Sequence, residues 1–447
     1  MPETVNNVER VKQFLAHSLE NAKPLLKQLH PSDIAKILED LPPASRQRII
    51  RLLPVEMASE AIGEMDEESR PEELLLQLSP SAAAKIIEEL DPDDAADLLA
   101  QIPLKDLRHI MARLQDEDTA QIKQLMTYDE DSAGGIMTPE LLKIPENFSK
   151  REAMEEVLRI SDEMEDFYAI YVVDEVDKLL GTVPLNDLIR AKPWTKVREL
   201  VDINLVKVKV DTDQEEVAKV ISKYNLAAVP VVDENGILLG RITFDDVMDV
   251  LEEESTEDIL RIAGVSEDEE LSGSWINAVK SRLPWLFVNL ITAFMAGLVI
   301  NTFSDTIDKI VIIASFMPIV AGVSGNSATQ ALAVTIRRIA TDRLGPKQFF
   351  SVVLKELTVG MVNGIVLGSI TGVAAFILGG NPLLGVVVFC AMVGNLLIGA
   401  FAGSAIPLFL NRINIDPAVA SSILMTALTD ILGYTLLLGL GALILNI

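Results

Sequence analysis

The sequence predicts a multidomain protein in which a helical-repeat domain, a repeated α/β module and a connecting helix precede an all-α membrane domain. Three observations predict this fold class. Residues 1–279 hold 29 basic and 60 acidic side chains, a balance of −31, whereas residues 280–447 hold 9 and 6. Two different internal repeats divide the acidic part. Five apolar segments fill the remainder, each long enough to cross a bilayer, which takes about 20 residues.

Composition also narrows the function class. So acidic a soluble part repels the phosphates of nucleic acid and favours cations or basic partners, so no nucleic-acid partner is expected. The single cysteine, Cys390, lies in an apolar segment and excludes a disulfide framework. The three histidines stand apart and no nucleophile–base pairing is visible, so an enzyme is the least favoured class. The N-terminus lacks the features of a signal peptide, so we expect it in the cytoplasm.

The first domain, residues 1–127, is predicted to be a stacked α-superhelix. The stretch "DIAKILEDLP" (33–42) returns 49 positions later as "AAAKIIEELD" (82–91), and short amphipathic stretches end at prolines. Its acidic group at Asp91, Asp93, Asp94 and Asp97 has two interpretations. Such runs usually form a solvated face with helix-capping roles. The same carboxylates could also meet another acidic surface across a cation.

Residues 128–198 and 199–250 are predicted to be two copies of one α/β module. "FYAIYVVDEVDKLLGTVPLNDL" (167–188) and "LAAVPVVDENGILLGRITFDDV" (226–247) share a β-rich run, an acidic turn and a second strand before a helix, and "DENG" predicts a tight hairpin. The pair resembles tandem CBS modules, which often bind adenine nucleotides. That resemblance makes ATP an open alternative at Thr243 and Asp246 in the second copy, whereas Pro184 replaces the threonine in the first.

A connecting helix is predicted over residues 251–279. The preceding module ends in a dense acidic run whose apolar residues keep helical spacing, so the run can form a helix that leads to the membrane. The candidate regulatory metal ligands of this acidic run are Asp245, Asp246, Asp249, Glu253 and Glu257.

The membrane domain, residues 280–447, has apolar segments near 284–301, 309–337, 348–378, 382–410 and 417–446. Basic residues lie before the first segment and in alternate connections, so the positive-inside rule places the N-terminus in the cytoplasm and the C-terminus outside. We expect a multi-pass protein of the cell membrane, the inner membrane in a cell that has two. The every-fourth-residue glycines from Gly360 to Gly372 are interpreted as helix packing.

Two membrane segments contain polar residues at positions where apolar residues would cost less free energy in a bilayer. "PIVAGVSGNSATQ" (318–330) predicts a helix broken by proline and glycine, with irregular backbone that survives only beside protein or water. Asp430 lies in the middle of the fifth segment, where a carboxylate costs roughly 2.5–3.5 kcal/mol. Together they predict a permeation path.

These features, in this order, resemble the MgtE-type magnesium channel family. The motifs are "YDEDSAGGIMTPE" (128–140) before the CBS modules, "GNSATQ" (325–330) in the second membrane segment and "DPAVASSILMTALTD" (416–430) in the fifth. The resemblance implies a homodimer in the lipid bilayer with a pore on the dimer axis, Asp430 at the ion-selecting position and Asn326 in the pore lining. The sequence departs from the family pattern at Ser324, Ala328 and Ser422–Ile423, which bears on pore dimensions.

A mechanism follows from the chemistry of Mg²⁺, which gives up its water shell reluctantly. Two Asp430 carboxylates would attract the hydrated ion, with Asn326, Ser422, Thr426 and the carbonyl of Gly322 contacting its waters. Cytosolic Mg²⁺ bridging the acidic groups would close the channel. Two alternatives stay open: a divalent-cation carrier coupled to protons or Na⁺, and a non-conducting CBS-based membrane sensor.

Overall fold

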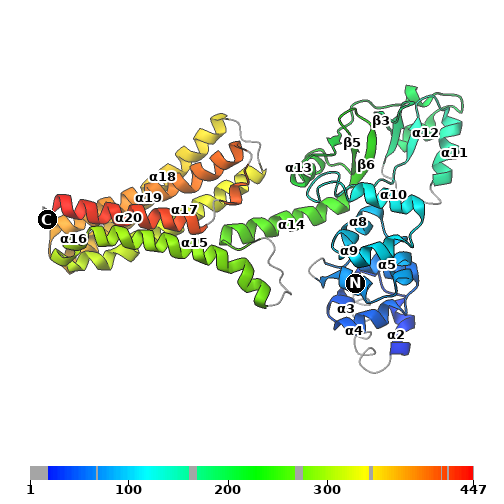
Figure 1. Cartoon of the computed structure of the whole chain (residues 1–447). Coiled ribbons are helices and arrows are strands. Elements are labelled where there is room, and N and C mark those ends of the chain that lie inside the picture. The colour runs from blue at the N-terminus through cyan, green and yellow to red at the C-terminus, as the bar shows by residue number, and fades with distance from the viewer. Residues whose placement is uncertain are drawn as a thin grey trace. The chain divides into compact units, whose positions relative to one another are not determined.

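The computed structural model describes residues 19–66, 69–160, 169–266, 275–341, 346–413, 415–419 and 422–445. The chain divides into two compact units, Met1–Glu254 and Ser255–Ile447. Helix α14 (Phe244–Ala263) contains the division (Figure 1). Residues 1–18 of the predicted first domain and 267–274 of the predicted connecting helix lie outside the described residues.

The first domain consists of short helices whose starts are set by proline. Proline suits the first helical turn because its missing N–H would have no partner there, and it stands at or just before the start of seven of these helices. The helices are α2 (Leu19–Leu26), α3 (Pro31–Glu39), α4 (Pro43–Ile50), α5 (Val55–Gly63), α6 (Pro71–Leu76), α7 (Pro80–Ile87), α8 (Pro92–Ala100), α9 (Leu104–Met111) and α10 (Asp116–Leu125).

The predicted repeat is confirmed by matching burial. Ile37 and Leu38 in α3 are fully buried, and their equivalents Ile86 and Ile87 in α7 are 4% and 1% exposed. All four contribute to one hydrophobic core that runs through the helical domain into the second α/β module. The helices therefore stack by burying the same face in each repeat.

The two modules have one topology. Each contains a three-stranded sheet in which the first pair of strands is parallel and the second antiparallel, with a register shift at the same place. The first module comprises β1 (Lys143–Pro145), α11 (Lys150–Ile160), β2 (Ile170–Val173), β3 (Leu179–Val183) and α12 (Leu185–Arg190). The second comprises β4 (Val208–Lys209), α13 (Gln214–Tyr224), β5 (Ala228–Val232), β6 (Leu238–Thr243) and the start of α14. The predicted duplication is confirmed.

The hairpin turns of the two modules are joined by main-chain hydrogen bonds. The N–H of Leu179 donates to the carbonyl of Gly236 at 2.9 Å, and the N–H of Leu238 donates to the carbonyl of Asp177 at 3.0 Å. Gly236 has a φ of +85°, which the predicted Asn-Gly turn requires. The turn of each module therefore completes the hydrogen bonding of the other.

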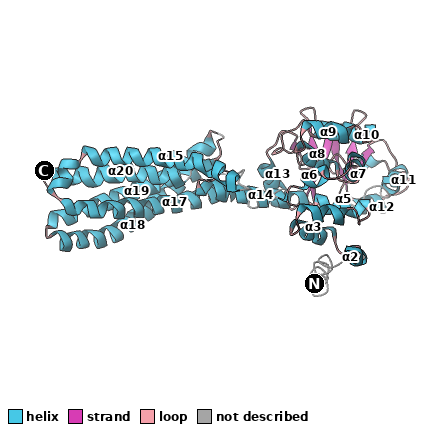
Figure 2. Cartoon of the chain, turned by 60° about the horizontal axis from the view of Figure 1, so that its bottom comes forward, coloured by secondary structure: helices cyan, strands magenta, loops and turns pink. Residues whose placement is uncertain are grey.

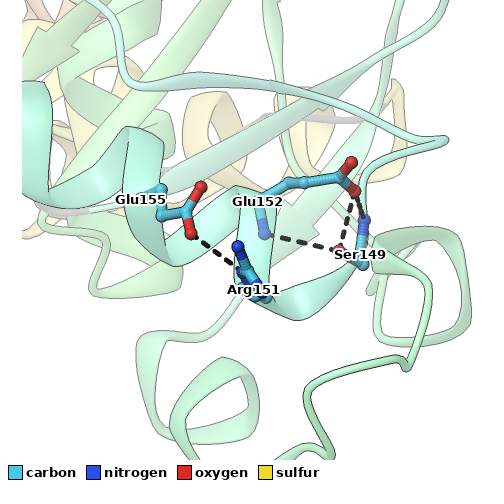
Figure 3. A network of polar contacts seen from close by, with 4 residues as sticks. All are labelled: Ser149, Arg151, Glu152 and Glu155. Carbon is cyan, nitrogen blue, oxygen red and sulfur yellow. Dashed lines mark hydrogen bonds and ion pairs between the residues drawn. The ribbon is translucent and has the colours of Figure 1, made fainter.

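Helix α11 begins with a capping box, which Figure 3 shows. The carboxylate of Glu152 accepts hydrogen bonds from the N–H of Ser149 at 2.6 Å and from its hydroxyl at 2.7 Å. Two positions into the helix, Arg151 pairs with Glu155 at 3.0 Å. The reciprocal contacts satisfy backbone donors that a helix start leaves open.

Among its described residues, the second unit contains five helices long and apolar enough to span a membrane (Figure 2). They are α15 (Trp275–Thr302), α17 (Met317–Thr341), α18 (Pro346–Gly379), α19 (Pro382–Arg412) and α20 (Ser422–Ile444). Three short elements connect them: α16 (Ser304–Lys309), η3 (Val311–Phe316) and η4 (Pro417–Val419). The predicted five-helix membrane domain is confirmed.

The predicted break in the second membrane helix is wrong. Helix α17 runs without interruption through residues 318–330. It begins at Met317 after a 3₁₀ turn, so Pro318 occupies the first helical turn, where a missing N–H costs little. The polar residues of this segment therefore line a regular helical face.

The glycines of α18 pack as predicted. A Cβ on Gly364 would lie 3.0 Å from the Cα of Val393, and one on Gly372 would lie 2.8 Å from the carbonyl oxygen of Gly385. Both contacts are with the backbone of α19, which cannot move aside as a flexible side chain can. The absence of side chains lets the two helix axes approach closely.

Candidate functional site

The polar residues predicted to line the pore lie on two neighbouring helices. Gly322 and Asn326, one turn apart on α17, are exposed in the single chain. On α20, Thr426 is exposed, whereas Ser422 and Asp430 are half-buried; the three are spaced at i, i+4 and i+8 and so share one face. The five residues thus form two polar stripes, one on each helix.

Helices α17 and α20 approach closely beside these stripes. A Cβ on Gly325 would lie 3.3 Å from Oγ1 of Thr429 and 3.7 Å from Oγ1 of Thr426. Gly325 precedes Asn326, and Thr429 precedes Asp430, so the contact brings the two predicted stripes to adjoining helices. Within the described residues no basic side chain pairs with Asp430. Its charge is therefore not neutralised by a described side chain of the same chain.

Asn395 on α19 ties these two helices together, and the sequence reasoning missed it. Its Nδ2 donates to the carbonyl of Val320 on α17 at 3.2 Å and to the carbonyl of Thr429 on α20 at 3.1 Å. The side chain is fully buried, and Gly433 is the residue whose missing side chain makes room for it. The available signal was a single amide side chain in the middle of an apolar membrane segment.

A second group of functional candidates lies in the first unit. Here the carboxylates of α8 lie close enough to a carboxylate of α14 to raise one another's pKa. Asp93 is 9% exposed, and its Oδ1 has no hydrogen-bond partner among the described residues. Burial, followed by the charges of Asp94, Asp246 and Asp91, raises the pKa of Asp93 well above its ordinary value. Removing these carboxylates from water and placing them together disfavours the charged form twice.

Asp94 belongs to the same group although its side chain reaches solvent. Burial of its surroundings, then the charges of Asp91 and Asp246, raise the pKa of Asp94 to about 8. Asp97 and Glu64 add to the effect. The name acidic cluster is used below for these facing carboxylates: Glu64, Asp91, Asp93, Asp94, Asp97, Asp245, Asp246 and Asp249.

The acidic cluster unites most of the predicted regulatory ligands and adds two residues. The pKa of Asp249 is raised first by burial and then by the charges of Asp246 on α14 and Glu64 at the end of α5. Glu64 was not predicted, and Asp93 was part of the predicted acidic group but not of the predicted ligands. Glu253 and Glu257 lie further along α14, and Glu257 pairs instead with Arg261. Among the described residues, no three His, Cys, Asp or Glu side chains form a ready-made metal site.

The residues predicted to bind nucleotide form a helix cap. Oδ2 of Asp246 accepts a hydrogen bond from the N–H of Thr243 at 3.0 Å and another from its hydroxyl at 2.5 Å. Burial raises the pKa of Asp246 while these two bonds oppose the rise. Because Asp246 also belongs to the acidic cluster, its surroundings suit a cation better than a phosphate group.

The end of α14 in the second unit is tied to the segment before α20. Arg261 pairs with Glu257 on its own helix and with Asp416. Gly264 follows with a φ of +76°, and a Cβ there would lie 2.5 Å from Cδ1 of Ile423. This end of the helix is therefore held against the start of the helix that carries Asp430.

Comparison with known proteins matches most of the chain to described families. The MgtE intracellular N domain matches residues 29–131, the CBS domain matches 133–193 and 197–253, and MgtE, described as a divalent cation transporter, matches 317–440. The chain is 31% identical to the magnesium transporter MgtE of Bacillus subtilis, over 95% of this chain and 94% of that one. It is 34% identical to the one from Thermus thermophilus, over 98% and 100%.

Two solved structures resemble the first unit. The soluble part of a magnesium transporter is 29% identical with a TM-score of 0.51, and covers 56% of this chain and 99% of its own. The cytosolic domain of the Mg²⁺ channel MgtE in complex with ATP is 35% identical with a TM-score of 0.51, and covers 54% and 99%. Both likenesses concern the helical domain and the CBS pair.

Proposed function

Because the chain belongs to the MgtE family of magnesium transporters, we propose that it is a channel that passes Mg²⁺ into the cell along the polar stripes of α17 and α20. The observation that carries the proposal is Asp430, a membrane carboxylate with no basic partner among the described residues. An ionisable residue inside a membrane segment is a functional residue by default, because its cost must be offset.

The stripes suit a hydrated divalent ion. Mg²⁺ keeps several waters when it binds, so it is held best by groups that accept hydrogen bonds from those waters. Asp430 supplies the charge, while Thr426, Ser422 and Asn326 supply hydroxyl and amide oxygens, and Gly322 leaves its helix backbone uncovered. A monovalent ion gains half the Coulomb attraction at the same distance, so divalent ions occupy the site preferentially.

The working assembly is a homodimer. Gly322, Asn326 and Thr426 are exposed in the single chain, and a polar helix face turned to lipid would be costly. A second copy related by a two-fold axis would cover the stripes of both subunits and place one Asp430 opposite the other. The ion would then meet two carboxylates on the axis.

The chain is oriented with its N-terminus in the cytoplasm and its C-terminus outside. Lys280 and Arg282 lie in the first turns of α15, and Arg337 and Arg338 lie near the end of α17. Arg412 ends α19. These ends face the same side of a bundle whose helices alternate in direction, and basic residues mark the cytoplasmic side.

The direct test is Mg²⁺ flux into proteoliposomes that hold the full chain. Asp430→Asn removes the charge and keeps the shape, and should abolish Mg²⁺ flux or its preference over Na⁺. Asp308→Asn is the matched control, because Asp308 is an exposed acid of α16. Unchanged Mg²⁺ flux and Na⁺ exclusion in Asp430→Asn would refute the pore site. Flux that follows a proton or Na⁺ gradient would replace the channel by a coupled carrier.

We further propose that cytosolic Mg²⁺ closes the channel by binding in the acidic cluster. Carboxylates on α8 and α14 repel one another, and a divalent cation removes this repulsion. Helix α14 runs from the cluster to Arg261, and Arg261 pairs with Asp416 before the helix that carries Asp430. The partnerless Oδ1 of Asp93 supports a cation there.

Neutralising the cluster tests this closure. The variant Asp94→Asn/Asp246→Asn/Asp249→Asn should conduct at Mg²⁺ concentrations that close the wild type. The control removes three exposed acids outside the cluster, at Glu175, Asp187 and Asp211, and should close normally. If the cluster variant closes like the control, the cluster is ordinary surface charge.

A nucleotide site in the CBS pair is proposed on the resemblance to the ATP-bound cytosolic domain. Thr243 and Asp246 are already engaged with each other, so we do not expect Asp246 to meet the phosphates, and the ribose or base is the better match. Equilibrium binding of ATP to the full chain, compared with Thr243→Val, tests this. An unchanged affinity would move the site away from Thr243.

A further inference from the structure

The second unit contains a cavity lined by both polar and apolar residues, which the sequence reasoning did not find. It has a volume of about 240 Å³ and lies between α17 and α18, with Ala400 of α19 also in its wall. Ser327 and Gln330 of α17 contribute a hydroxyl and an amide to its lining. From α18 come Lys355, Glu356 and Asn363, so five polar side chains surround a cavity inside a membrane domain.

Helix geometry explains why these side chains converge. Glu356, Gly360 and Asn363 are spaced at i, i+4 and i+7 and share one face of α18. Gly360 keeps this face close to α19, because a Cβ there would lie 2.7 Å from the Cβ of Ala400. The two helices meet at the glycine, and the larger polar residues on either side of it border the cavity.

The two charged residues of the cavity differ in how far they are exposed. Glu356 is 7% exposed, whereas the side chain of Lys355 is 58% exposed. Their charged atoms lie 3.4 Å apart, although adjacent residues of a helix point in different directions. The carboxylate is thus buried at the cavity, whereas the ammonium lies on a flexible, mostly exposed side chain that can move away from it.

The cavity has the capacity for a hydrated ion. A water molecule occupies about 30 Å³ of liquid volume, so about 240 Å³ corresponds to roughly eight waters. Mg²⁺ with an octahedral shell of six waters fits this space without losing them. Glu356 supplies the charge for such an ion, and the oxygens of Ser327, Gln330 and Asn363 can accept hydrogen bonds from its waters.

The cavity also adjoins the proposed pore face. Gln330 lies one helical turn beyond Asn326 on α17 and is exposed on the same stripe. In the proposed orientation this turn is on the cytoplasmic side of Asn326. An ion that has passed Asp430 and Asn326 would therefore reach Gln330 next.

We propose that the Glu356 cavity is a second binding site for hydrated Mg²⁺ on the cytoplasmic side of the pore, called the station below. In this proposal Lys355 is a tethered cation that competes with the ion for the Glu356 carboxylate. This inference rests on the proposed channel function. Mg²⁺ arriving displaces the ammonium from Glu356, and the returning ammonium helps to release the ion. The station prevents tight binding because its carboxylate always has an alternative partner.

The two charges must then have opposite effects on the dependence of flux on Mg²⁺ concentration. Glu356→Gln should raise the half-saturating Mg²⁺ concentration roughly ten-fold, the effect of losing one carboxylate about 5 Å from a divalent ion in a water-like dielectric. Lys355→Gln should lower it. Asn363→Leu fills the cavity but keeps the ion pair, and should lower the maximal flux. A merely structural ion pair predicts instead that Glu356→Gln and Lys355→Gln impair the channel alike.

A binding measurement separates failure of the station from failure of the channel. Mn²⁺ bound to the purified full chain is counted by electron paramagnetic resonance, with the acidic cluster neutralised in every sample. Glu356→Gln should lose a site that Lys355→Gln retains. If flux depends on Asp430 while both Glu356 measurements are unchanged, the station is overturned and the pore proposal stands. If no variant conducts, a lost Mn²⁺ site still supports the station, and an unchanged count overturns it.

Discussion

The guanidinium of Arg261 pairs with the carboxylate of Asp416, which joins residues 155 positions apart. Both side chains are about two-thirds buried, and Asp416 also accepts a hydrogen bond from the N–H of Ala418 at 2.8 Å. Ile262, the next residue of α14, packs against a cluster formed by α17, α19 and α20. The pair therefore fixes the end of α14 to the helix bundle.

Breaking this pair should weaken closure by Mg²⁺ without stopping conduction. Arg261→Gln removes an attraction of about 1 kcal/mol, so closure should require roughly five-fold more Mg²⁺. Flux measured against the Mg²⁺ concentration on the cytoplasmic side gives this shift. Arg159→Gln is the control, because Arg159 forms an exposed pair with Glu156 in the first module. If the charge-exchanged double variant Arg261→Asp/Asp416→Arg restores normal closure, the two charges act as a pair.

The acidic cluster should make stability depend on pH and Mg²⁺ together. Asp94 has a folded-state pKa of about 8 against an ordinary 3.8, with Asp91, Asp246, Asp97 and Glu64 facing it. Between these values the folded chain holds a proton that the unfolded chain releases, so the stability from this group is lost as pH rises through about 8. Thermal unfolding of the full chain in detergent with EDTA should give a lower Tm at pH 9 than at pH 6.

Mg²⁺ should reverse that loss, because it binds the deprotonated carboxylates. Adding Mg²⁺ should therefore raise the Tm more at pH 9 than at pH 6. Asp94→Asn should reduce both effects, whereas Asp187→Asn, an exposed acid of the first module, should leave them unchanged. Equal stabilisation by Mg²⁺ at the two pH values would contradict the assignment.

Asn395 should be required for both stability and conduction. Asn395→Leu keeps the volume but leaves the carbonyls of Val320 and Thr429 without its two donated bonds, a loss of about 1–3 kcal/mol. Because Thr429 precedes Asp430, the maximal Mg²⁺ flux should fall as well. Asn411→Ala, at an exposed position of the same helix, is the control. A variant with normal flux and normal stability would show that the amide is dispensable.

Replacing glycine by alanine should have opposite effects on stability at two positions of the membrane domain. Alanine favours a helix over glycine by about 1 kcal/mol. At Gly297 of α15 a Cβ meets nothing within 4 Å, so Gly297→Ala should be neutral or stabilising. At Gly372 a Cβ would lie 2.8 Å from the carbonyl of Gly385, so Gly372→Ala should destabilise by about 1–3 kcal/mol. The Tm of the two variants in detergent gives the comparison, and equal values would mean that α18 and α19 separate easily.

Much of the fold could be predicted because its signals are periodic. The repeat at Ile37 and Ile86, the duplicated hairpins and the glycines of α18 each follow a spacing that one mechanism explains. The break at Pro318 was mispredicted because proline both ends and starts helices, and the start at Met317 depends on the preceding 3₁₀ turn. Local pattern alone does not decide between the two.

The candidate sites were predicted unevenly for a similar reason. Asp430 stands out because a charge in an apolar run is costly wherever its side chain points. Asn395 and Glu356 depend on which residues of other helices they face, and no spacing within α18 or α19 contains that information. Glu64 joins the acidic cluster in the same way, from a helix that the acidic group at Asp91 does not share.

The mutual bonds between the turns at Asp177 and Gly236 have a consequence for how the CBS pair can change. Both bonds use only backbone atoms, so substitutions such as the proline at position 184 leave the join intact. One copy can therefore lose the side chains that recognise a ligand and still hold the other copy through backbone hydrogen bonds. We therefore expect a displacement of one hairpin turn to be transmitted to the other.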